Sequence, residues 1–78
     1  MLNKYEKGNA EKALNKLKET IEDSIKDLEE QIGSKMPKDK RKTLVRNRYL
    51  GKLRGSASQQ YKNDCWNYVK DELEYLWK

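Results

Sequence analysis

The sequence predicts an all-α fold, a small three-helix bundle, from three observations. Apolar residues recur at spacings of three and four, period-2 alternation is nearly absent, and Gly33, Pro37 and Gly55 divide the chain. A chain of 78 residues forms one domain at most. We expect a loosely ordered N-terminal lead-in over residues 1–8 and a single helical domain over residues 9–78, with helices at about 9–32, 37–53 and 57–77.

The first helix is expected to begin at Asn9, a good N-cap residue, and to end at Gly33, a typical C′ residue. Its apolar positions are Leu14, Leu17, Ile21, Ile25, Leu28 and Ile32. At about 100° per residue these side chains lie within an arc of roughly 80°, a narrow seam that faces one partner. The pattern departs from a strict heptad at Ser24 and Gln31, which favours bundle packing over a long coiled coil.

The second helix is expected to begin at Pro37, because proline suits the first turn of a helix, and to reach about Leu53. Its apolar face consists of Val45, Tyr49, Leu50 and Leu53. Gly51 weakens the last turn by about 1 kcal/mol relative to alanine, so the helix could end there.

The third helix is expected to follow Gly55 and to open at Ser56 or Ser58. Its apolar residues are Tyr61, Cys65, Trp66, Tyr68, Val69, Leu73, Tyr75, Leu76 and Trp77. They cover an arc of roughly 200°, wide enough to contact two neighbours at once. We therefore expect this helix at the centre of the bundle, with the other two packed on it.

Composition argues against several classes of function. Cys65 is the only cysteine and histidine is absent, which speaks against a disulfide, a closed zinc site or papain-like chemistry. The scattered glycines form no phosphate-binding loop, and no apolar run is long enough for a transmembrane helix or signal peptide. We expect a cytoplasmic protein that is not an enzyme, with no metal, no cofactor and no membrane partner, and we expect the Cys65 thiol to be buried and structural.

A chain this short builds a core worth only about 3–5 kcal/mol, so self-association is one expected source of stability. A homodimer and a well-packed monomer both fit the sequence. The residues expected at an oligomer or partner interface are Ile21, Ile25, Leu28, Trp66 and Trp77.

Positive charge is concentrated in the middle of the chain. Residues 36–54 contain eight basic residues and one acidic residue, Asp39, whereas the rest of the chain contains ten basic and twelve acidic residues. Such a block predicts a polyanionic partner, nucleic acid in the first place, and the alternatives are an acidic protein or a solvated face that maintains solubility.

Within this block Arg41, Arg48 and Lys52 lie at i, i+7 and i+11, so they should form a stripe on one side of the second helix. The residues expected to bind phosphates are Arg41, Arg48, Lys52 and Lys40, with Lys38 and Lys42 at the helix start.

The junction at Gly55 resembles a helix-turn-helix outline, with a plain helical hairpin as the alternative. If the junction forms a helix-turn-helix, the start of its recognition helix would carry Gln59, Gln60, Lys62 and Asn63. We take Lys62 and Asn63 as further candidates for base or phosphate contacts.

The predicted function is a small basic nucleic-acid-binding regulator or accessory protein, with DNA and RNA both open. The alternative is a helical protein-interaction module, an inhibitor, adaptor or scaffold that docks on an acidic or helical partner.

Overall fold

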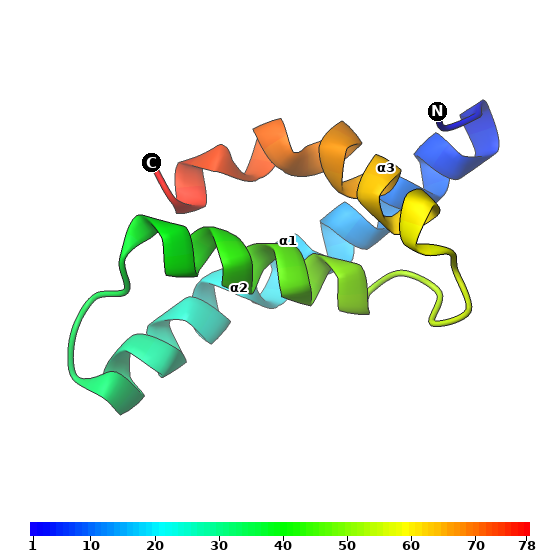
Figure 1. Cartoon of the computed structure of the whole chain (residues 1–78). Coiled ribbons are helices and arrows are strands. Elements are labelled where there is room, and N and C mark those ends of the chain that lie inside the picture. Colours follow the sequence, from blue (N-terminus) through cyan, green and yellow to red (C-terminus); the bar gives the residue numbers. More distant parts are fainter.

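The computed structural model describes residues 1–78 and confirms the all-α prediction of a small three-helix bundle. The chain contains helices α1 (Lys4–Ile32), α2 (Lys38–Gly51) and α3 (Gln59–Val69), followed by a 3₁₀ segment η1 (Lys70–Leu76), and no strand (Figure 1). No helix combines the length and the apolar character needed to cross a membrane.

The helix α1 begins five residues earlier than predicted, so the expected loose lead-in over residues 1–8 is wrong. Asn3 is the N-cap, and its side-chain oxygen accepts a hydrogen bond from the Glu6 N–H at 2.8 Å. The Glu6 carboxylate in turn accepts one from the Asn3 N–H at 3.0 Å, which completes a capping box. Leu2 is buried against the core, which fixes the chain ahead of the cap.

The other end of α1 lies where the sequence placed it. Gly33 adopts a left-handed conformation with φ of 75°, and its N–H donates to the Glu29 carbonyl at 2.9 Å. Glycine adopts this backbone conformation without the steric penalty that a side chain would bring.

The helix α2 ends at Gly51, two residues before the predicted limit. Ser58 caps α3, since its hydroxyl accepts from the Tyr61 N–H at 3.1 Å. The predicted third helix continues beyond Val69 as the 3₁₀ segment η1 rather than as α-helix. Side chains three residues apart eclipse one another in a 3₁₀ helix, and Leu73 and Leu76 are accordingly both buried.

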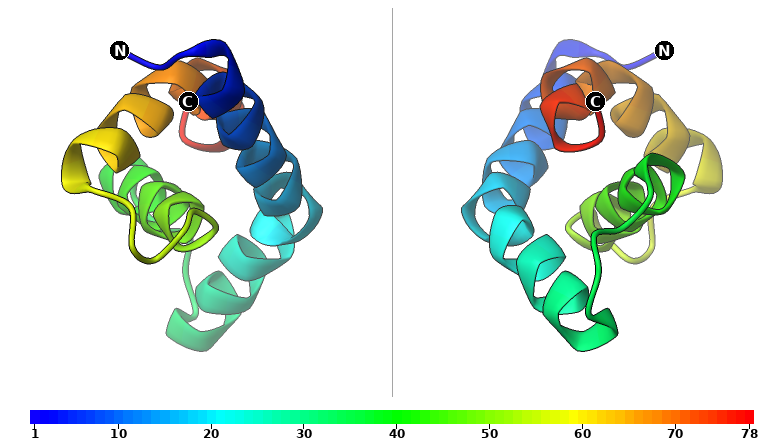
Figure 2. Two further views of the ribbon diagram at one scale, coloured as in Figure 1. Left: turned by 90° about the vertical axis from the view of Figure 1, so that its right-hand side faces the viewer. Right: turned by 90° about the vertical axis from the view of Figure 1, so that its left-hand side faces the viewer.

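The three helices all contact one another and share one core. Figure 2 views the molecule close to the axis of α2, with α1 on one side of it and α3 on the other. α1 supplies six of the 14 buried residues, and α3 and η1 together supply five, so these two parts of the chain share the core rather than the third helix alone forming its centre. The core residues are Leu2, Ala10, Ala13, Leu14, Leu17, Ile21, Ile25, Val45, Tyr49, Cys65, Trp66, Val69, Leu73 and Leu76.

Most of the predicted interface residues are used within one chain. Ile21, Ile25 and Trp66 are buried in the core, so they are not available to a second subunit in this structure. Leu28 and Trp77 are half-buried, and the Trp77 ring lies 5.9 Å from that of Trp66. The burial of Cys65 is confirmed.

Candidate nucleic-acid interface

Arg41 does not belong to the outward basic stripe that the sequence predicted. Its Nη2 donates to Glu29 Oε2 at 2.9 Å, and its Nη1 reaches the Leu76 carbonyl at 3.4 Å. The Arg41 hydrogen bond, followed by one from the Met36 N–H, lowers the pKa of the Glu29 carboxyl below its ordinary value. Arg41 therefore joins α2 to the end of α1 and to η1, and its charge is neutralised by the protein's own carboxylate.

The other seven basic residues of the block form no ion pair. The three ion pairs of the structure are Arg41 with Glu29, the N-terminal amine with Asp64, and Lys78 with Glu74. The seven unpaired cations are Lys38, Lys40, Lys42, Arg46, Arg48, Lys52 and Arg54, all exposed except the half-buried Arg46. The same segment contains one acidic residue, Asp39.

These cations lie along two flanks of α2 rather than in a single stripe. On the flank toward α3, the Lys42 ammonium lies 5.8 Å from the centroid of the Trp77 ring, and Arg46 donates to Asn63 Oδ1 at 3.2 Å. On the other flank, Arg48 and Lys52 are one helical turn apart, and Lys52 lines a cleft shared with α1. Lys38 and Lys40 extend the positive surface over the start of α2.

The junction between α2 and α3 has the arrangement of a helical hairpin, because α3 and η1 run back against the direction of α2 (Figure 1). The side chains expected to read bases are engaged within the chain. Asn63 Oδ1 accepts from Arg46 and, at 3.4 Å, from Gln59, while Gln60 donates to Asp64 at 2.9 Å.

Lys62 is half-buried. The surface of α2 therefore offers more free donors than the start of α3 does.

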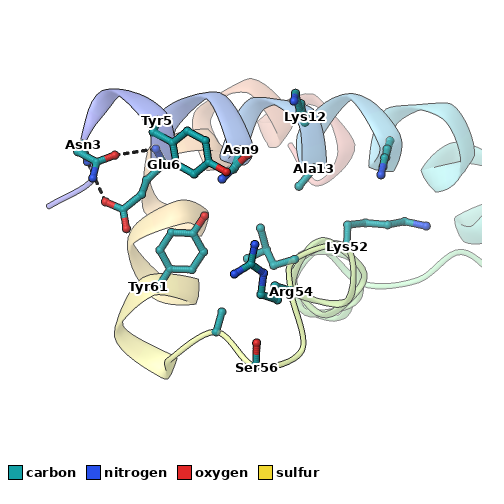
Figure 3. A pocket seen from close by; sticks show the side chains of 13 residues that line it. Asn3, Tyr5, Glu6, Asn9, Lys12, Ala13, Lys52, Arg54, Ser56 and Tyr61 are labelled. Carbon is teal, nitrogen blue, oxygen red and sulfur yellow. Dashed lines mark hydrogen bonds between the residues drawn. The ribbon is translucent and has the colours of Figure 1, made fainter.

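A cleft of about 540 Å³ lies between the first half of α1 and the α2–α3 connection, residues 52–58 (Figure 3). Its lining includes four cations from two separate segments, Lys12 and Lys16 from α1 with Lys52 and Arg54 from the connection. Glu6 is the only acid in the lining, and its carboxylate is held by the capping box. We call this feature the basic cleft.

Sequence reasoning did not select Lys12, Lys16 or Arg54 as site residues. The spacing of Lys12 and Lys16, one turn apart, was the available signal for a shared face of α1. That they share a cleft with Lys52 and Arg54 depends on helix packing across about 40 positions of sequence, which no local pattern encodes.

Charge is also divided along α1 itself. The first half, residues 4–18, has five lysines against two acids, and the second half, residues 19–32, has six acids against one lysine. The basic half lines the cleft, whereas the acidic half extends to the turn at Gly33 (Figure 1). The two halves of α1 therefore carry net charges of opposite sign.

No family model matches this chain, and comparison with curated proteins and with solved structures finds no significant similarity.

Proposed function

We propose that this protein binds nucleic acid, chiefly through the phosphate backbone, as a small regulator or accessory factor. One observation supports the proposal above the others: seven of the eight basic residues in the block on and just beyond α2 have no carboxylate partner within the chain. Surfaces that serve solubility alone usually mix both signs of charge. A rigid helix that presents unpaired cations on two flanks suits a polyanion.

The physical basis is counterion release. Each lysine or arginine that neutralises a phosphate releases condensed cations from the nucleic acid, so affinity falls as salt rises. The acidic half of α1 would be repelled by the same phosphates. This repulsion would orient the molecule with α2 and the basic cleft toward the ligand.

The test is a fluorescence anisotropy titration of duplex DNA, single-stranded DNA and structured RNA over a series of salt concentrations. A triple variant, Lys38→Gln, Lys40→Gln and Arg48→Gln, removes three exposed cations that form no ion pair or cation-π contact within the chain. Each lost phosphate contact should reduce the slope of log affinity against log salt by about 0.9 on B-DNA and about 0.7 on single strands. We expect a total reduction of about 2–3 in the slope.

A matched control carries Lys4→Gln, Lys18→Gln and Lys26→Gln, exposed positions of α1 outside the basic cleft. It has the same net charge as the triple variant, so it separates local contact from overall charge. Equal loss of binding in both variants would contradict a specific interface on α2. Preference for polyglutamate over all three nucleic acids would instead favour the alternative of an acidic protein partner.

A further inference from the structure

The basic cleft combines cations with an exposed aromatic ring. Tyr5, in the first turn of α1, lines the cleft and is 74% exposed, and Tyr61 from α3 lines the same end (Figure 3). The aromatic and cation-π contacts of the structure join other rings, so the faces of the Tyr5 ring have no such partner. Proteins that bind single-stranded nucleic acids combine accessible aromatic rings with nearby cations in this way.

We propose that the basic cleft holds one unpaired nucleotide of a single-stranded nucleic acid, with its phosphate on Arg54 and its base on Tyr5. This inference rests on the proposed function and specifies the form of nucleic acid. It also places a second contact region beside the cations of α2.

The cations of the cleft are free to take a phosphate. None of Lys12, Lys16, Lys52 and Arg54 forms an ion pair, and all four are exposed. The Arg54 side chain extends into the space between α1 and α3 (Figure 3). A planar guanidinium in this position can bind two phosphate oxygens at once.

The rest of the lining suits a base and its sugar. Asn9 and Ser56 supply amide and hydroxyl groups that can donate and accept hydrogen bonds. The Tyr61 hydroxyl, whose pKa is raised by burial, can also donate and accept. The cleft volume of about 540 Å³ lies within the range of small-molecule sites, about 300–1,000 Å³.

An unpaired nucleotide fits this arrangement better than a base pair does. In a duplex the base faces are covered by their neighbours, and exposing one requires unstacking. In a single strand the base face is available to Tyr5 while the adjoining phosphates remain near α2. The protein should therefore prefer single strands to duplexes of the same length.

The experiment compares a labelled oligothymidylate with a duplex of equal length, using Tyr5→Ala, Arg54→Gln and the control Tyr75→Ala. Tyr75 is 56% exposed on η1 and lies outside the cleft. We expect Tyr5→Ala to weaken single-strand binding by about 5-fold to 100-fold, the range for loss of one stacked base. Duplex affinity should stay within about twofold, as should both affinities of the control, because Tyr75 lies outside the cleft.

Arg54→Gln should also weaken single-strand binding and reduce its salt slope by about 0.7, as expected for one lost phosphate. Circular dichroism of each variant verifies that the helices are intact. If single-strand binding is unchanged in Tyr5→Ala and Arg54→Gln but lost in the triple variant of α2, the cleft proposal is overturned and the proposed function stands. If the wild-type protein binds none of the polymers, both are overturned.

Discussion

Replacement of Tyr49 by phenylalanine tests how α1 and α2 are held together. Tyr49 is fully buried, and its hydroxyl donates a hydrogen bond of 2.9 Å to the Ala10 carbonyl of α1. Its ring packs 5.9 Å from the Trp66 ring at a tilt of 48°. The substitution removes the hydroxyl oxygen and keeps the ring, so it isolates one hydrogen bond between two helices.

The expected loss follows from the net value of an intramolecular hydrogen bond. The Ala10 carbonyl lies within α1 and retains its place in the helical hydrogen-bond ladder, so no unsatisfied group is left behind. The free energy of unfolding should then fall by about 0.5–1.5 kcal/mol. For a domain of this size about 1 kcal/mol corresponds to a fall in Tm of about 4–8 °C.

Thermal and urea unfolding, followed by far-UV circular dichroism, measure this difference. Tyr75→Phe is the matched control because Tyr75 is 56% exposed and its hydroxyl has no hydrogen bond in the structure. The control should change the free energy of unfolding by no more than about 0.5 kcal/mol. A Tyr49→Phe protein as stable as the wild type would refute the reasoning.

The same pair of proteins should respond differently to alkaline pH. Burial raises the pKa of Tyr49 above its ordinary value of 10.0, so the folded state keeps a proton that the unfolded state releases. The contribution of Tyr49 is therefore fully present below pH 10.0 and decreases as pH rises above it. Because phenylalanine does not titrate, the stability difference between wild type and Tyr49→Phe should narrow above that pH. A difference that stays constant would contradict the assigned burial.

Three further outcomes are expected from the capping residue, the internal ion pair and the thiol. Asn3→Ala should lower the free energy of unfolding by about 0.5–2 kcal/mol in urea, since the N-cap bond is lost, and no change would mean that α1 frays at its start. Arg41→Gln should lower Tm at neutral pH and leave the salt slope of nucleic-acid binding unaltered. The Tm difference between this variant and the wild type should shrink as pH falls below 4.5, the ordinary pKa of Glu29. The reason is that the Glu29 carboxylate, whose pKa is lowered in the folded state, loses its stabilising contribution as it becomes protonated. A Tm difference that does not depend on pH would argue against the ion pair. Cys65, whose pKa is raised by burial, should react with a thiol reagent in urea but not in the folded protein, and rapid reaction of the native form would contradict its position.

The number of helices and their approximate limits could be predicted because they depend on local patterns. Apolar spacing and the residues Gly33, Pro37 and Gly55 marked the elements correctly. The start of α1 was also readable, since Asn3 followed by Glu6 is a capping-box sequence. The only apolar residues before Asn9 are Met1, Leu2 and Tyr5, which are too few to establish a helical period by themselves.

The candidate site could be predicted only in part. Helical spacing showed that Arg41, Arg48 and Lys52 lie near one another on α2, but it could not show which neighbour would cover that side. Glu29 occupies part of it, twelve residues away in sequence, and withdraws Arg41 from the surface. The same limitation concealed that Lys12 and Arg54 line one cleft.

The sequence by itself determined that the chain is helical, where its turns fall, and that its middle carries an excess of positive charge. These properties follow from residue types within one or two helical turns. Only the tertiary structure decided which cations are free, that they lie on two flanks of α2, and that a basic cleft forms beside Tyr5. The packing of α1 against α2 and α3 places these groups, and it depends on contacts between residues far apart in the chain.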